Sequence, residues 1–136
     1  MNVLRSIAAV VVSYAVVFVI VWLSDPLLAH LYPGQYVPDK VPPAFLLRAS
    51  TFIFALASII GGGLCVRIAP SRPGLHLMIL FFIGEIVGAV FAMKNWATWP
   101  HWYSIIWLAI WPVGLWLGGL AKKRQTRQKL ERLGAA

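Results

Sequence analysis

The sequence predicts an all-α integral membrane protein, a four-helix bundle that crosses the bilayer four times. Apolar residues make up 60% of the 136 residues and charged residues only 12%, against roughly a quarter in soluble domains. The apolar residues gather in four runs, each near the ~20 residues that a helix needs to cross ~30 Å of hydrocarbon. Backbone polar groups cannot stay unpaired in hydrocarbon, and four such runs cannot close a barrel, so each run is expected to be a helix.

The first span is expected at residues 6–24, which carry no charge between Arg5 and Asp25. A secretory signal peptide is the alternative, because it also starts with a charge followed by an apolar run. Its apolar region, however, is about 7–15 residues long and ends in a small-x-small cleavage site. The run here is longer and ends in WLSDP, which favours an uncleaved anchor. The proline-rich stretch 24–43 is then a long external loop.

Three further spans are expected, each bounded by charges or prolines. Pro42 and Pro43 stand at the start of the second, where the missing proline N–H has no helical partner to lose. The connections that follow are short, and short loops force consecutive helices to pack antiparallel. The expected spans are residues 44–66, 74–93 and 102–120.

The distribution of Lys and Arg predicts the orientation, because cytoplasmic loops carry the excess of these residues. Nine lie at the N-terminus, between the second and third spans, or in the tail, and three lie on the opposite side. Both termini are therefore expected in the cytoplasm of a bacterium, with the protein in its inner membrane. Residues 122–136 form a basic cytoplasmic tail.

The tail residues are expected to contact lipid headgroups, since each Lys or Arg near an anionic membrane gains about 1 kcal/mol. An acidic cytoplasmic partner is the alternative. Nucleic acid is excluded, because that side offers no second basic element or stacking platform. The residues in question are Lys122, Lys123, Arg124, Arg127 and Lys129.

Glu85 is the sharpest chemical signal, because it lies near the middle of the third span. A charged side chain there costs on the order of 2.5–3.5 kcal/mol, so such residues usually face the bundle interior. Glu85 either binds and releases protons or cations during transport, or is structural. In the structural interpretation it is a neutral hydrogen-bonding group or pairs with Arg48, whose long side chain can span the difference in depth.

Small residues recur at helical spacing on three spans and predict faces for close helix packing, which is how helices associate in lipid. A conduction path along the Thr51 and Ser58 side is the alternative. The glycines at 61–63 permit either a very close helix approach or a break in the second span. The packing residues are Thr51, Ala55, Ser58, Gly62, Gly84, Gly88, Gly114 and Gly118.

The sequence predicts no catalytic residue, no metal site and no cofactor. The three histidines do not lie at matching depths on different spans, as a haem held by two histidines requires. Cys65 is the only cysteine, which excludes an internal disulfide and an iron–sulfur cluster. His30 and His101 lie on the external side without a recognisable zinc spacing. An enzyme acting at that surface is the weakest of three hypotheses.

One stretch carries a resemblance. Residues 61–76 contain a glycine triplet, the turn Arg67-Ile68-Ala69-Pro70 and the start Arg72-Pro73-x-x-His76. In these features the chain resembles small uncharacterised bacterial four-span membrane proteins, which implies no activity. Its size is similar to small multidrug resistance transporters and dual-topology fluoride channels. It lacks the first-span glutamate of the former and the intramembrane asparagine of the latter.

The other two functional hypotheses do not involve an enzyme. The first is a small non-catalytic subunit, an accessory or stabilising protein of a larger membrane complex, with membrane lipids and other membrane subunits as partners. The second is a transporter or channel that works by self-association and uses Glu85. The first rests on several close-packing faces in a chain without a redox or hydrolytic motif.

Overall fold

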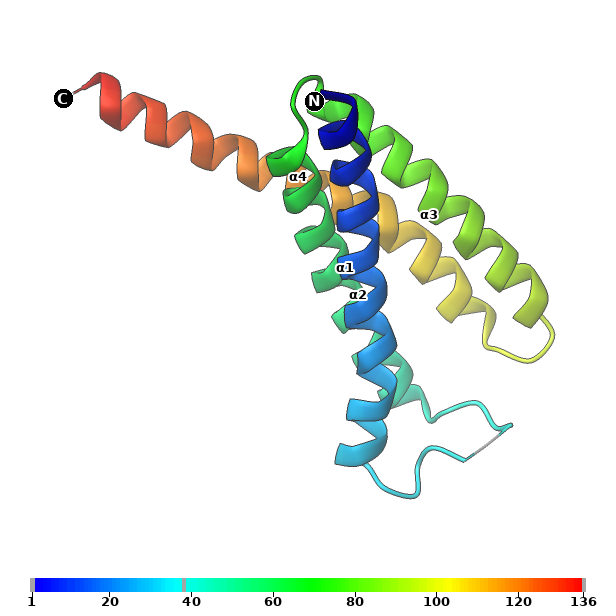
Figure 1. Cartoon of the computed structure of the whole chain (residues 1–136). Coiled ribbons are helices and arrows are strands. Elements are labelled where there is room, and N and C mark those ends of the chain that lie inside the picture. The colour runs from blue at the N-terminus through cyan, green and yellow to red at the C-terminus, as the bar shows by residue number, and fades with distance from the viewer. Residues whose placement is uncertain (1, 38, 136) are drawn as a thin grey trace.

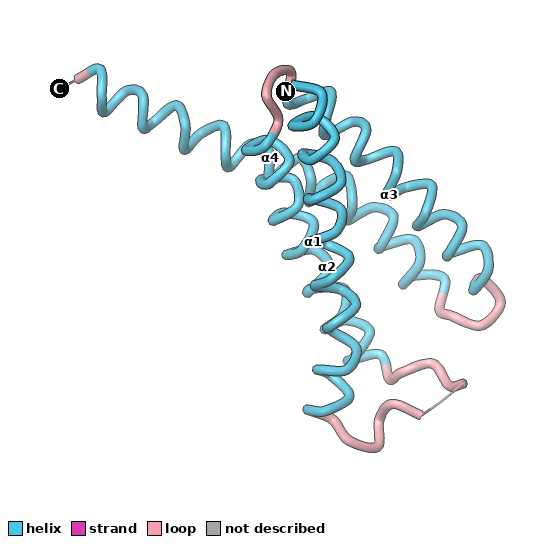
Figure 2. Tube along the Cα trace, in the orientation of Figure 1, coloured by secondary structure: helices cyan, strands magenta, loops and turns pink. Residues whose placement is uncertain are grey.

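The computed structural model describes residues 2–37 and 39–135, and its regular structure there is entirely α-helical. Four helices follow one another along the chain, and the longest connection lies between the first two (Figures 1 and 2). The predicted all-helical class is confirmed for the described residues, and each helix is long and apolar enough to cross a membrane. The helices are α1 (Asn2–Leu31), α2 (Ala44–Ile68), α3 (Pro73–Asn95) and α4 (His101–Gly134).

All four helices extend beyond the expected spans, α2 and α3 by at most two residues at either end and α1 and α4 by more. α1 continues through Asp25 and Pro26 to Leu31, so the connection to α2 is shorter than the predicted 24–43 loop. The expected boundary was set at the first charge, but a helix can continue past the edge of the hydrocarbon because water and headgroups tolerate its polar side chains. α4 likewise continues as one helix through the basic residues of the tail and leaves the bundle (Figure 1).

The core lies where α2 contacts both α1 and α4. α2 and α4 pack together most extensively, α1 covers a second side of α2, and α3 contacts α4 more than it contacts α1 or α2. Apolar side chains from α1, α2 and α4 meet in the centre, among them Val17, Phe54, Trp111 and Leu115. α3 is therefore the most peripheral helix, and much of its surface faces outward.

Glycines allow the close contact between α2 and α4. A Cβ atom added to Gly62 would come within 2.8 Å of Leu115 Cα, and one on Gly118 within 2.8 Å of the Gly63 nitrogen. α2 stays helical through residues 61–63. The glycine triplet therefore serves close approach, and the alternative of a break in this helix is wrong.

A smaller contact holds α3 on α4. Gly84 lies against the indole of Trp111, and Trp111 Nε1 donates a hydrogen bond of 3.1 Å to the Phe81 carbonyl oxygen. One turn further along, Gly88 faces Leu108. Below this contact, towards the end of the molecule that holds the α1–α2 loop, α1 and α3 diverge (Figure 1).

Candidate functional site

The line of contact between α2 and α4 separates two recesses, both near the loop end of the molecule. The hydroxyl groups of Ser50 and Tyr103 lie 3.3 Å apart and share a hydrogen bond. One turn deeper, the rings of Phe54 and Trp107 stack with centroids 4.1 Å apart and planes 5° from parallel. No described residue lines both recesses. The two recesses thus have different lining residues, although both lie against the α2–α4 contact.

The first recess, here called the aromatic cleft, lies between α1 and α3 and has a volume of about 380 Å³. α2 and α4 form its floor, and residues of the α1–α2 loop, including Tyr36, reach its mouth. Its lining is mainly apolar, as is usual for small-molecule sites, which measure roughly 300–1,000 Å³. The cleft therefore has the size and composition of a ligand site.

An aromatic wall runs from the α3–α4 connection into α4, from the mouth of the cleft to its depth. Trp99, Tyr103, Trp107 and Trp111 follow one another at intervals of four residues and all line the cleft. The centroids of Trp99 and Tyr103 are 5.3 Å apart, as are those of Tyr103 and Trp107. Phe54 of α2 stacks on Trp107 and lies 6.0 Å from Trp111. The rings therefore form a connected series of aromatic contacts along one wall of the cleft.

Two carboxylates line the same cleft at different depths. Asp25, on α1, is exposed at the mouth, where its negative charge adds to the effect of burial in raising the pKa of Tyr36. Glu85, on α3, is half-buried, and its Oε1 atom has no solvent contact and no hydrogen-bond partner in the described structure. Among the described lining residues there is no Lys, Arg or His. The cleft is thus acidic as well as aromatic.

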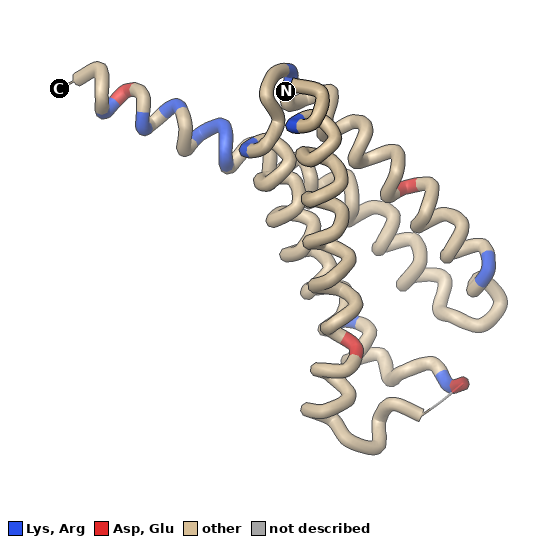
Figure 3. The backbone as a smooth tube through the Cα atoms, in the orientation of Figure 1, with Lys and Arg blue, Asp and Glu red and all other residues tan. Residues whose placement is uncertain are grey.

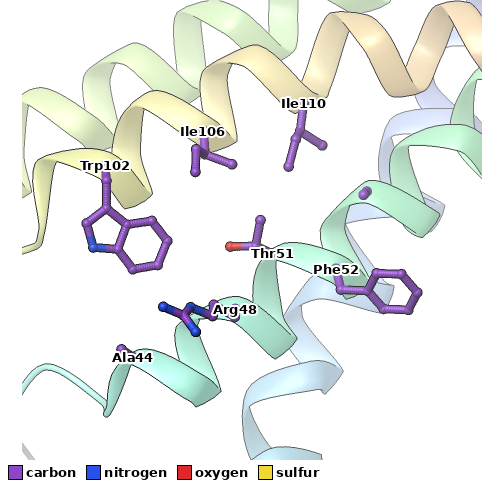
Figure 4. A pocket seen from close by; sticks show the side chains of 8 residues that line it. Ala44, Arg48, Thr51, Phe52, Trp102, Ile106 and Ile110 are labelled. Atoms are coloured by element: carbon purple, nitrogen blue, oxygen red, sulfur yellow. The ribbon is translucent and has the colours of Figure 1, made fainter.

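The second recess, here called the outer groove, lies on the other side of the α2–α4 contact (Figure 4). Arg48 and Thr51 point from α2 towards the α4 side chains that form the opposite wall, and Ala55 continues the α2 wall one turn deeper. Thr51 donates its hydroxyl proton to the Leu47 carbonyl oxygen at 2.7 Å, so its methyl group is left for packing. The α4 wall consists of Trp102, Ile106 and Ile110.

The structure does not bring Arg48 and Glu85 together. Arg48 lines the outer groove and Glu85 lines the aromatic cleft, with the α2–α4 contact between them. The comparison of helix depth that made an ion pair plausible took no account of which face each residue occupies. Within residues 2–37 and 39–135 the ion pair that forms is Arg127 with Glu131, an exposed pair on the α4 extension.

The predicted packing residues divide between two environments. Ser58, Gly62, Gly114 and Gly118 lie at the α2–α4 crossing, and a Cβ on Gly114 would collide with Ser58. Gly84 and Gly88 face α4 from α3. Thr51 and Ala55 instead line the outer groove, which no other helix of the described chain fills. The face of small residues predicted on α2, here called the α2 seam, is therefore packed against α4 at Ser58 and Gly62 and open to the outer groove at Thr51 and Ala55.

The remaining candidates lie away from both recesses. The basic residues of the tail occupy the α4 extension, where Figure 3 shows them along a helix that points away from the bundle. His101 stacks on Trp96, and its Nε2 lies 3.1 Å from the Trp96 carbonyl oxygen. His30 is exposed in the last turn of α1. The structure thus gives neither histidine a place in the cleft or the groove.

The aromatic wall is the feature that sequence reasoning missed. Tyr103, Trp107 and Trp111 recur every four residues within α4, which marks one face of a helix, and Trp99 precedes Tyr103 by the same interval. That spacing was the available signal. Comparisons with protein families, with curated proteins and with solved structures found no match to this chain.

Proposed function

We propose that the chain is a small non-catalytic membrane protein, an accessory or stabilising subunit that binds a larger membrane complex through its outer groove. The observation that carries this proposal is the open half of the α2 seam. Arg48, Thr51 and Ala55 face a groove that no other helix of the described chain fills. Small residues at helical spacing favour close approach of another helix in lipid.

Arg48 indicates which chemical groups a partner helix in the groove would carry. An arginine within a membrane span usually pairs with a polar or acidic group, or extends towards a headgroup phosphate. It lies in the second turn of α2, beside Trp102 in the first turn of α4. A partner helix with an acidic or carbonyl-rich end at this depth would satisfy the guanidinium while its apolar surface covers Ala55.

The proposed location is the bacterial inner membrane with both termini in the cytoplasm. The N-terminus, the α2–α3 turn and the start of the α4 extension lie at one end of the bundle (Figure 1), and most Lys and Arg residues are found there (Figure 3). Positive charge is retained on the cytoplasmic side. The helical tail then starts at the lipid surface, where its basic residues meet anionic headgroups.

The test of the accessory role is selective co-purification from native membranes in mild detergent. Ala55→Leu fills the groove and is expected to remove a stoichiometric partner from the eluate. Ala109→Leu is the matched control, because Ala109 is an exposed α4 alanine that lines neither recess. A solitary monomer in native membranes, or equal loss of the partner in both variants, would contradict the proposal.

A second candidate is a homo-oligomeric transporter or channel that uses Glu85. It is supported by the carboxylate oxygen that lies without solvent or partner in the aromatic cleft. A group so placed can exchange a proton for a cation during transport. Glu85→Gln is then expected to abolish pH-dependent flux into liposomes, whereas unchanged flux would exclude this role.

A further inference from the structure

The aromatic cleft concentrates negative charge in a chain that is strongly basic. The sequence has only four acidic residues and a formal net charge of +8. Two of the four, Asp25 and Glu85, line this one cleft, and no basic side chain of the described residues lines it. The other two lie elsewhere: Asp39 in the α1–α2 loop and Glu131 on the α4 extension. A ligand that complements the charge of the cleft is therefore positively charged.

The depth of Glu85 restricts what can carry that charge. Its Oε1 atom is closed off from solvent and lacks a hydrogen-bond partner, and a carboxylate in such surroundings is costly unless it is paired. A small inorganic cation needs several oxygen ligands at close range. Aromatic rings and aliphatic groups dominate the lining instead. The cation must therefore bring its own apolar surface.

The aromatic wall is suited to a cation of this kind. Positive groups bind over the faces of Trp, Tyr and Phe rings within about 6 Å of the centroid, and desolvation strengthens the attraction. Trp99, Tyr103 and Trp107 provide such rings in sequence from the mouth inwards. Asp25 at the mouth and Glu85 in the depth stand at the two ends of this path.

We propose that the aromatic cleft binds a lipophilic organic cation, whose charged centre lies near Glu85 and whose apolar groups lie against the α4 rings. Side chains of both α1 and α3 line the cleft, and the proposed entry from the bilayer lies between these two helices. Asp25 attracts the cation to the mouth, and Glu85 holds it. The groove occupied by Arg48 takes no part, because it lies behind the α2–α4 contact.

The test measures binding of tetraphenylphosphonium to the purified full chain in neutral detergent, by equilibrium dialysis and by quenching of tryptophan fluorescence. Tetraphenylborate is the control ligand, because it has nearly the same shape and the opposite charge. The cation is expected to bind and the anion is not. Equal binding of the two ions would show that the cleft is merely apolar and would overturn the proposal. This comparison needs no variant.

Variants locate the site. Glu85→Gln is expected to weaken tetraphenylphosphonium binding about tenfold or more, because it removes the charge that faces the desolvated cation. Glu85→Asp keeps the charge and should retain most of the affinity, and Glu131→Gln, far from the cleft, should leave it unchanged. Unchanged affinity in Glu85→Gln, or equal losses in Glu85→Gln and Glu131→Gln, would contradict the proposed site.

Binding in detergent is independent of the accessory role and of transport. A chain that fails to bind tetraphenylphosphonium but still loses its membrane partner on Ala55→Leu keeps the accessory role and loses the cation site. A chain that binds the cation without moving it across liposomes keeps the site and loses the transporter hypothesis.

Discussion

The aromatic cleft and the outer groove lie on opposite sides of the same helix pair, yet their chemistry is opposite. The cleft combines two carboxylates with a wall of aromatic rings and has no basic residue among its described lining, whereas the groove has one arginine and no acidic residue among its described lining, beside alanine, threonine, isoleucine and two aromatic side chains. The cleft is deep enough to deprive a carboxylate oxygen of solvent, and the groove leaves Arg48 exposed. This difference is the basis for proposing a ligand on one face of the α2–α4 pair and a partner helix on the other.

The cleft and the groove are kept apart by the close approach of α2 and α4. Of the variants considered, Gly62→Ala should disturb this approach most. The new Cβ would lie within 2.8 Å of Leu115 Cα, and overpacking of this kind costs roughly 1–3 kcal/mol. We expect a lower melting temperature by tryptophan fluorescence in detergent, with both recesses lost together. Gly74→Ala is the control, because a Cβ there meets nothing within 4 Å. Equal melting temperatures for the two variants would place the α2–α4 contact elsewhere.

Trp111→Phe should affect the cleft and spare the groove. The variant loses the hydrogen bond from Trp111 Nε1 to the Phe81 carbonyl oxygen, worth roughly 0.5–1.5 kcal/mol, and with it part of the attachment of α3. Amide hydrogen exchange is expected to accelerate more in α3 than in α2, because α2 keeps its separate glycine contact with α4. Trp116→Phe is the matched control, since Trp116 is 63% exposed. Equal acceleration in α2 and α3 would mean that the two sides are not independent.

Tyr36 reports on the charge at the cleft mouth, with the smallest expected effect. Burial raises the pKa of Tyr36, and the negative charge of Asp25 raises it further, so its tyrosinate forms only at higher pH than that of a free tyrosine. Asp25→Asn removes the second cause and should shift this titration to lower pH, although burial keeps the pKa of Tyr36 above its ordinary value. Ultraviolet difference titration of tyrosinate formation measures the shift, and Asp39→Asn is the control. An unchanged pKa of Tyr36 in Asp25→Asn would mean that Asp25 does not lie at the mouth of the cleft.

Helix positions and the closest helix contact could be predicted from the sequence, because both depend on local composition. Apolar runs locate the four helices, and the spacing of Gly62, Gly114 and Gly118 marks faces that meet in the structure. The end of α1 could not be predicted in this way, since charge marks the limit of the hydrocarbon and not the limit of the helix.

The two recesses could not be predicted, because they depend on rotation of the helices about their axes. Depth along the membrane suggested that Arg48 and Glu85 could meet, but α4 packs against α2 so that each residue faces a different side. The α4 aromatic spacing carried part of the missing information. It shows which face of α4 is aromatic, but only the packing of α1 and α3 shows that this face lines a cleft.

The most direct test of the account compares tetraphenylphosphonium affinity in Arg48→Gln and Glu85→Gln. The structure puts Arg48 behind the α2–α4 contact, so Arg48→Gln should change the affinity by less than about twofold, as expected for a distant independent site. Glu85→Gln should weaken it about tenfold or more, because the desolvated cation loses its counter-charge. If removing Arg48 strengthens binding markedly, Arg48 and Glu85 compete within one site, and the division into cleft and groove is wrong.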